Sequence, residues 1–276
     1  MEGNALYKMP TIDLSAQSLL MLSQFGMFAT FAWWGLEDSD GGIELAFPLV
    51  MAVAGLSLFL SVPNARMGVT LGVPALMAIM MVAMGEGEDA VWAVFMLLVL
   101  GPVCYMPAMA TGDPSLELDD ESRMTRLGWL YLIFALAMGL LGSGFLEGVT
   151  QGELSDQDSE GNTITHTLES DDTLIAQAGL AIVVVGIVLF LLTAVMDMEL
   201  GPSRPWHGGV LLAVSAVLSS LLWSSASGQG VLTSDILFMI ALSGLFVLTP
   251  CIAYEGAHAP QAHAHVTAPS FSSESE

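Results

Sequence analysis

Charged residues are scarce in this sequence, and positively charged ones are the scarcest. Only 12% of the 276 residues are charged, whereas a soluble domain carries about 25%. So small a share of charge cannot cover a globule of this size with a water-soluble surface, which excludes a soluble enzyme. Five Lys and Arg residues stand against 28 Asp and Glu, a formal net charge of −23. A protein that binds nucleic acid needs a basic surface, so that class is excluded as well.

Sequence patterns for catalysis are also lacking. The sequence has no Gly-rich phosphate loop, no nucleophile elbow, no His-Glu-x-x-His motif and no Cys-x-x-Cys pair. No Lys, Arg or His lies in the middle of an apolar run, so a proton relay or a haem held by paired histidines has no candidate residue. We therefore expect no enzymatic activity and no cofactor, and no motif identifies a family.

Long apolar runs are what the sequence does have. Hydrophobic residues make up 54% of the chain, and the mean hydropathy is +0.70. A helix needs about 20 apolar residues to cross a bilayer. Eight runs approach or exceed this length, at 15–36, 43–62, 67–84, 89–111, 127–148, 173–196, 206–226 and 232–255. The sequence therefore predicts an all-α integral membrane protein with eight transmembrane helices, embedded in the lipid bilayer.

The five basic residues predict the orientation of these helices. With a cytoplasmic N-terminus, Lys8, Arg66, Arg123, Arg126 and Arg204 all fall on the cytoplasmic side. Basic residues near span ends resist translocation, so this distribution is the expected one. The acidic residues then divide into 12 on the cytoplasmic face and 16 on the outer face. We predict a multi-pass protein of the cell membrane with both termini in the cytoplasm.

The two halves of the sequence resemble each other. VAGLSLFL at 53–60 matches VVGIVLFL at 184–191, and GVTLGVPAL at 68–76 matches GVLLAVSAV at 209–217. Because four spans are an even number, two copies of a four-span unit insert the same way up. This arrangement predicts two parallel repeats related by an axis along the membrane normal. The alternative is a chance likeness between segments rich in Leu, Val and Gly.

These observations divide the chain into segments. We expect a cytoplasmic N-terminus at 1–14, a first four-helix repeat at 15–111, a cytoplasmic connector at 112–126, a second four-helix repeat at 127–255 and a disordered cytoplasmic tail at 256–276. An acidic outer loop is expected at 149–172. Its segment DQDSEGN at 156–162 resembles the start of a calcium loop, but Thr167 stands where that loop has Glu. A solvated acidic loop is the simpler interpretation. Cys104 and Cys251, both near the cytoplasmic side, are expected to be free thiols.

A few polar residues within the spans are candidates for a substrate path. Gln24 is the strongest deep polar group, and Thr30, Ser57 and Thr193 are weaker ones. Each could contact a solute at the boundary between the repeats. The alternative for Gln24 is a hydrogen bond to a neighbouring helix.

Four methionines form a stripe at helical spacing on the third span. They are Met77, Met80, Met81 and Met84. Thioethers are soft ligands for Cu(I), so the stripe is a speculative metal path. Methionine is abundant in this chain, with 18 residues, and commonly fills gaps in apolar packing. Simple packing is therefore the alternative.

The sequence leaves two main functions open. The first is a transporter-like protein that carries a neutral small or lipid-like solute along the interface between the repeats. The second is a membrane scaffold or complex subunit that does not transport, with a membrane-protein partner or a second copy of itself bound through small-residue faces. Copper handling through Met and Cys is a third and more remote possibility.

Overall fold

The computed structural model describes residues 12–37, 39, 45–84, 91–157, 163–228 and 230–256, without the side chains at 81, 83, 84, 91 and 92. The chain is mostly helical. Its main helices are α1 (Ala16–Glu37), α2 (Ala46–Phe59), α3 (Ala65–Met84), α4 (Val91–Thr111), α5 (Asp120–Leu136), α6 (Phe145–Gln151), α7 (Ser170–Phe190), α8 (Pro205–Ser227) and α9 (Thr233–Glu255). A 3₁₀ turn, η3 (Pro114–Leu116), precedes α5, and π-helical turns extend α5 and α7 as η4 (Ala137–Leu141) and η5 (Leu191–Val195). The strands are β1 (Glu153–Gln157) and β2 (Thr163–Thr167).

Six of the described helices are long and apolar enough to cross a membrane. They are α1, α4, α5 with η4, α7 with η5, α8 and α9. α2 has only 14 residues, which span about 21 Å. The described apolar part of α3, Ala65–Met80, also falls below the length for a span. The chain thus has the long apolar helices of an all-α membrane protein, and two of the eight predicted spans are short.

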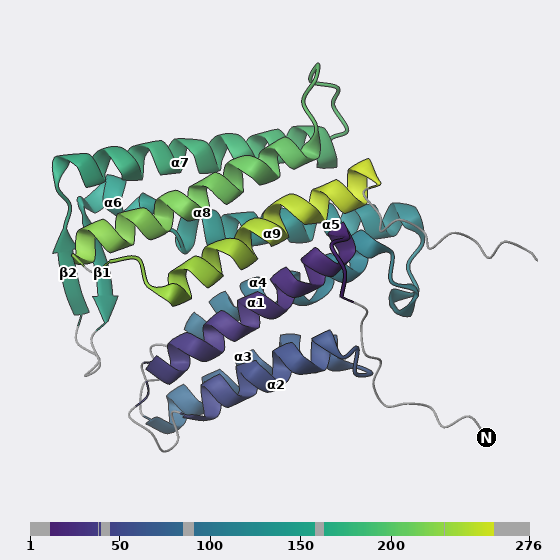
Figure 1. The fold of residues 1–276 in the computed structure, drawn as a ribbon, viewed down its shortest axis with the longest axis horizontal. Helices are drawn as coiled ribbons and strands as arrows, with labels where there is room; N and C mark the ends of the chain where they lie inside the picture. Colours follow the sequence, from purple (N-terminus) through teal and green to yellow (C-terminus); the bar gives the residue numbers. More distant parts are fainter. Residues whose placement is uncertain are drawn as a thin grey trace, which may run out of the picture.

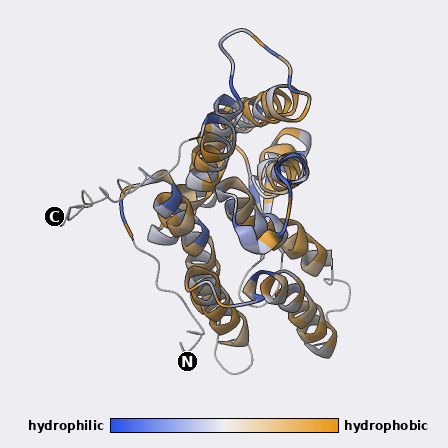
Figure 2. Ribbon diagram, turned by 90° about the vertical axis from the view of Figure 1, so that its right-hand side faces the viewer, coloured by the Kyte–Doolittle hydropathy of each residue, from blue (hydrophilic) through white to orange (hydrophobic). Residues whose placement is uncertain are grey.

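The outward faces of the helices are apolar, as expected for helices in lipid. Leu174 and Val185 of α7 are 66% and 55% exposed, and Ile240 of α9 is 64% exposed. Figure 2 shows hydrophobic residues along most of each helix, with hydrophilic residues concentrated at helix ends and connections. A water-soluble protein rarely exposes so much contiguous apolar surface.

The helices run up and down in one bundle (Figure 1). α4 and α9 contact each other near the middle; α4 also contacts α1, α3 and α5, and α9 also contacts α1 and α8. On the outside, α2 packs against α1, and α7 packs against α8. One end of the bundle is where α3, α5 and α8 begin and where α4, η5 and α9 end (Figure 1). Four arginines lie at or near the starts of α3, α5 and α8, so they gather at this end: Arg66, Arg123, Arg126 and Arg204.

The fifth predicted span, 127–148, is interrupted. α5 starts earlier, at Asp120 inside the expected connector, and is capped by Asp119, which accepts a hydrogen bond from the Ser122 amide. After η4 the helix stops, and α6 starts behind Gly144, whose φ is +72°. A positive φ suits glycine, which has no Cβ, so this residue allows the chain to turn within an apolar run.

The acidic stretch at 149–172, expected to be a loop, contains a β-hairpin. β1 and β2 pair antiparallel, with Glu153 opposite Thr167 and Gln157 opposite Thr163. Leu154 is fully buried beside Gly144 and Gly148, so the hairpin is anchored to the bundle. It lies at the end opposite the arginines (Figure 1). The centre of the proposed calcium loop, 158–162, lies outside the described residues, as do 257–276 of the predicted tail and 1–11.

Candidate functional site

Gln24 replaces a hydrogen bond that proline removes from α4. In an α-helix the carbonyl of Val103 accepts from the amide of residue 107, but Pro107 has no N–H. The Gln24 side chain, 9% exposed on α1, donates from Nε2 to the Val103 carbonyl oxygen at 2.7 Å. An unpaired carbonyl in an apolar interior costs free energy, so this contact is structural. Gln24 therefore binds a neighbouring helix, the alternative considered for it from the sequence.

Tyr131 makes the equivalent bond in the second half of the chain. Pro250, inside α9, leaves the carbonyl of Phe246 without its helical donor. The buried hydroxyl of Tyr131, on α5, donates to that carbonyl at 2.7 Å. The Tyr131 ring also stacks on Phe190, with ring centroids 3.9 Å apart. In both halves, a side chain from the first long helix supports a proline-interrupted carbonyl on the last one.

Apolar side chains fill the boundary between the two halves. α1, α4, α5 and α9 meet there and contribute fully or almost fully buried residues to a single core: Leu20, Met27, Val99, Leu100, Val103, Met106, Leu127, Tyr131, Phe134, Leu245 and Phe246. The two strongest polar groups of this region, Gln24 and Tyr131, are both engaged in the bonds described above.

The other three predicted path residues bond within their own helices. Thr30 donates to the Gly26 carbonyl at 2.9 Å, Ser57 to Ala54 at 2.8 Å, and Thr193 to Leu189 at 2.7 Å. Thr30 and Thr193 are buried, and Ser57 is half-buried. Ser57 lines a groove between α2 and α3, which is described below, whereas Gln24, Thr30 and Thr193 do not line it. The structure thus does not bring Gln24, Thr30, Ser57 and Thr193 together at that groove.

A small serine-lined cavity lies beside the interruption after η4. Ser143, Ser215 and Ser219 line it from α8 and from the chain between η4 and α6, together with apolar groups of η4 and α9. The three hydroxyls donate to carbonyls at 2.6, 2.7 and 2.9 Å, and the Ser219 bond reaches the Ser143 carbonyl, which lies at the interruption. The cavity volume is about 10 Å³, room for about one water molecule.

The methionine stripe on α3 is only partly described. Met77 is half-buried and packs against the core, and Met80 is half-buried. The side chains of Met81 and Met84 lie outside the described residues, so the copper interpretation stays a prediction. Cys104 and Cys251 are both free thiols, as expected.

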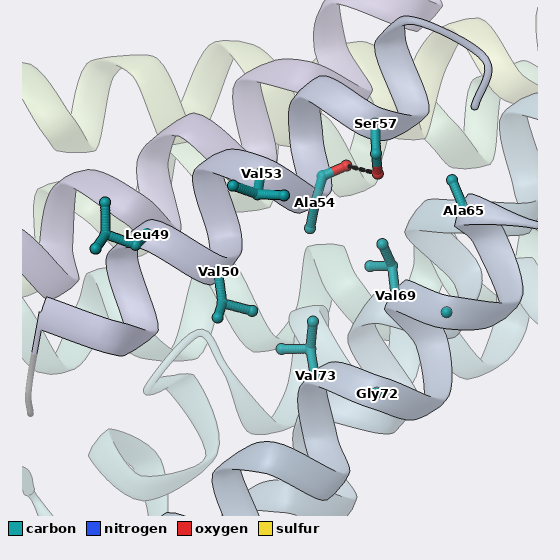
Figure 3. A pocket seen from close by; sticks show the side chains of 10 residues that line it. Leu49, Val50, Val53, Ala54, Ser57, Ala65, Val69, Gly72 and Val73 are labelled. Atoms are coloured by element: carbon teal, nitrogen blue, oxygen red, sulfur yellow. Dashed lines mark hydrogen bonds between the residues drawn. The ribbon is translucent and has the colours of Figure 1, made fainter. Parts of the chain in front are cut away.

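A groove lies between α2 and α3 (Figure 3). Its volume is about 400 Å³. Val50 and Ala54 of α2 face Val69 and Val73 of α3, and Ser57 is the one polar side chain among the lining residues. The remaining lining residues are Leu49, Val53, Ala65, Gly68 and Gly72. This groove opens outward between α2 and the described apolar part of α3, which are both shorter than a membrane span.

Gly68 and Gly72 form an uncovered small-residue face in this groove. A Cβ built on either glycine would meet no atom within 4 Å. The glycines of α8, whose sequence at 209–217 resembles 68–76, have different surroundings. A Cβ on Gly209 would lie 2.2 Å from the Phe246 carbonyl oxygen, and one on Gly208 would lie 2.7 Å from the Gly186 carbonyl oxygen. Glycines four residues apart allow membrane helices to approach closely. The second half uses its glycines for packing inside the chain, whereas Gly68 and Gly72 are open.

An ion pair fixes the start of α3, at the end of the groove. The Arg66 guanidinium binds the Asp113 carboxylate and donates to the Ser115 hydroxyl at 2.9 Å. Partial burial raises the pKa of Asp113, but hydrogen bonds from Ser115 and the Arg66 guanidinium outweigh it and hold that pKa below its ordinary value. The groove therefore ends in a paired charge.

Searches against family models, curated proteins and solved structures found no match to this chain. The assignment of function therefore rests on the geometry alone.

Sequence reasoning missed both the groove and the role of the prolines. The Gly-x-x-x-Gly spacing at 68–72 could have been read as a helix-association face, since the motif lies in an apolar run. Pro107 and Pro250 could have indicated carbonyls in need of donors. Which side chains supply those donors depends on helix packing.

Proposed function

We propose that the protein is a non-enzymatic membrane scaffold or complex subunit that holds a transmembrane helix of another polypeptide in the groove between α2 and α3. The observation that carries the proposal is the contrast between this groove and the boundary between the two halves. The boundary is filled by apolar side chains, and its two strongest polar groups, Gln24 and Tyr131, donate to carbonyls within the protein. The buried hydroxyls of Thr249 and Tyr254 on α9 have no hydrogen-bond partner among the described residues. The groove is apolar, open and lined by glycines with nothing against them.

Eight membrane helices with both termini in the cytoplasm form the frame of this proposal. α2 and α3 belong to it although they are short, because they expose large apolar side chains such as Leu49, Val53 and Ile79, each more than 60% exposed. A short membrane helix is accommodated by local thinning of the bilayer or by association with other helices. The gathering of four arginines at one end supports a cytoplasmic assignment for that end.

A duplicated four-helix unit also belongs to the proposal. If α1, α2, α3 and α4 correspond to α5, α7, α8 and α9, some of the helix contacts fall into matching pairs. α1 packs on α9 as α5 packs on α4, and α3 packs on α4 as α8 packs on α9. The bonds of Gln24 to α4 and Tyr131 to α9 support the same correspondence. On this basis the two halves differ in two places. α2 and α3 leave a groove where α7 and α8 pack closely, and α2 packs against α1 whereas α7 has few contacts with α5.

Transport of a small neutral solute is the second candidate, favoured by the serine-lined cavity beside the interrupted helix. Interrupted helices form solute sites in several transporters. This candidate predicts that liposomes containing the protein take up a solute and that Ser219→Ala changes the uptake rate. The scaffold proposal predicts no protein-dependent uptake in a screen of neutral solutes.

A photocrosslinking amino acid in the groove tests the scaffold proposal. It is placed at Val53, a lining residue of the groove that is 65% exposed on α2, and in a control at Val185, 55% exposed on α7, in cells that express the full chain. We expect a polypeptide adduct from position 53, lipid adducts alone from position 185, and loss of the polypeptide adduct when Gly68→Ile fills the groove. Lipid adducts alone from both positions, or an adduct that survives Gly68→Ile, would contradict the proposal.

A further inference from the structure

The interruption after η4 places non-helical backbone in a buried part of the bundle. η4 ends at Leu141, and α6 begins only at Phe145. Ser143, between them, is buried, as are Met138 and Gly139 before it. Backbone groups buried away from bulk water need other hydrogen-bond partners. Membrane proteins supply such partners with Ser and Thr side chains of neighbouring helices and with ordered water.

Serine hydroxyls supply two of the donors at this interruption. The Ser143 hydroxyl donates to the Gly139 carbonyl at 2.6 Å, and the Ser219 hydroxyl of α8 donates to the Ser143 carbonyl at 2.9 Å. Ser215 of α8, also buried, donates to a carbonyl of its own helix at 2.7 Å. Each hydroxyl has one hydrogen and two lone pairs, so all three hydrogens are used while the oxygens can still accept. The Phe145 amide donates to one of these oxygens, that of Ser143, at 3.4 Å.

The three serines line one cavity between the interruption, α8 and α9. Its other walls are apolar side chains and glycine backbone: Met138, Gly139, Gly142, Ala216, Phe238, Leu242 and Phe246. The cavity volume is about 10 Å³, close to the least that holds a water molecule. A buried water needs two to four polar partners, and an apolar cavity of this kind stays dry. Three hydroxyl oxygens with lone pairs to offer meet the requirement for water.

We propose that this cavity binds one water molecule, which donates hydrogen bonds to the Ser143 oxygen and to a serine oxygen of α8, Ser215 or Ser219. The water acts as the donor because the hydrogens of the three hydroxyls are already used. It fastens the interrupted helix to α8 at the point where the helical hydrogen bonds stop. A larger solute does not fit in this volume, so the site is a fixed part of the bundle. This inference is independent of what occupies the groove between α2 and α3.

Transfer of magnetisation from water to single backbone amides tests the site, by solid-state NMR on the full chain in liposomes. Gly142–Ser143 is the one Gly–Ser pair in the sequence, so carbonyl-labelled glycine with nitrogen-labelled serine isolates the Ser143 amide. Val185–Gly186 is the one Val–Gly pair and isolates a control amide in α7. A Cβ on Gly186 would lie 3.2 Å from the Gly208 carbonyl oxygen, so this amide is tightly packed. We expect transfer to Ser143 to be at least about threefold faster than transfer to Gly186.

Variants of the cavity separate its water from water elsewhere. Ser215→Val removes one hydroxyl and adds a methyl group that fills the cavity, so transfer to Ser143 should fall to the level of Gly186. Ser219→Ala removes an oxygen without adding volume and should also slow the transfer. Thr30→Val is the matched control, because Thr30 is a buried residue of α1 whose hydroxyl likewise donates within its own helix. It should leave transfer unchanged, and thermal unfolding in detergent verifies that each variant folds.

The outcomes decide between a bound water and its alternatives. Faster transfer to Ser143 that the two cavity variants reduce and Thr30→Val preserves supports the bound water. Equal transfer to Ser143 and Gly186 in the unsubstituted protein overturns it. Faster transfer that neither cavity variant changes also overturns it, because the water then reaches Ser143 from outside the cavity. Solute uptake by liposomes that Ser219→Ala alters would make the cavity part of a path, which contradicts a fixed water.

Discussion

The role assigned to Gln24 can be tested by restoring the hydrogen-bond donor that Pro107 lacks. If Gln24 exists to satisfy the Val103 carbonyl, then Pro107→Ala, which supplies a backbone N–H, should make Gln24 nearly dispensable. If Gln24 instead serves a solute path, the two positions should act independently. The experiment is a double-mutant cycle of Gln24→Leu and Pro107→Ala.

The structure sets the size of the expected coupling. Hydrogen bonds between membrane helices average about 0.6 kcal/mol and reach about 1.7 kcal/mol. The Gln24 bond is short, at 2.7 Å, and buried, and its acceptor has no helical donor. We therefore expect Gln24→Leu to lower the free energy of unfolding by about 1.5 kcal/mol with Pro107 present. In the Pro107→Ala background the cost should fall to about 0.5 kcal/mol, a coupling of about 1 kcal/mol.

Reversible unfolding by SDS in mixed micelles, followed by tryptophan fluorescence, measures these four free energies. Tyr131→Phe provides an internal reference, because it removes the equivalent bond to the Phe246 carbonyl and should respond to Pro250→Ala in the same way. Equal costs of Gln24→Leu in the two backgrounds would refute the structural role of Gln24 and reopen the substrate path.

Two further predictions concern helix packing and charge. Gly209→Ala should destabilise the protein by about 1–3 kcal/mol, because its Cβ would lie 2.2 Å from the Phe246 carbonyl oxygen. Gly68→Ala should instead stabilise the detergent-solubilised monomer by up to about 1 kcal/mol, because its Cβ meets no atom within 4 Å and alanine favours a helix more than glycine does. Similar melting shifts for the two alanine variants would contradict this. Arg66→Gln should cost up to about 1 kcal/mol at pH 7. Because the pKa of Asp113 is lowered in the folded state, the ion pair contributes above the ordinary carboxyl pKa and is lost as pH falls through the folded value. Melting temperatures of wild type and Arg66→Gln should therefore converge in acid, and a constant difference would disprove the assignment.

The apolar runs predicted the helices well because length and hydropathy follow directly from the sequence. The ends of α8, Pro205–Ser227, and α9, Thr233–Glu255, fall within one residue of the predicted spans. The interruption after η4 was missed, since its glycines lie in a run whose hydropathy is continuous. The hairpin was missed because the acidic residues on both sides of TITHT at 163–167 favoured a solvated loop.

The candidate site was harder to predict than the helices. The position of Gln24 deep within a predicted span identified it as a candidate site residue. Its hydrogen bond to the Val103 carbonyl is explained by Pro107, which is distant in the sequence and comes close to Gln24 only after folding. The groove depends on how far α2 and α3 diverge, a property of packing that neither helix encodes alone. Gly68 and Gly209 occupy matching sequence contexts and still differ fully in their surroundings.

The central claim is that a helix, not lipid, occupies the groove between α2 and α3. A fluorescent amino acid at Val53, which lines the groove, compared with one at Val185, reports this directly when the protein is reconstituted with lipids brominated along their acyl chains. We expect bromine to quench the probe at 185 strongly and the probe at 53 weakly, and we expect Gly68→Ile to remove the protection at 53. Equal quenching at the two positions in the unsubstituted protein would contradict it.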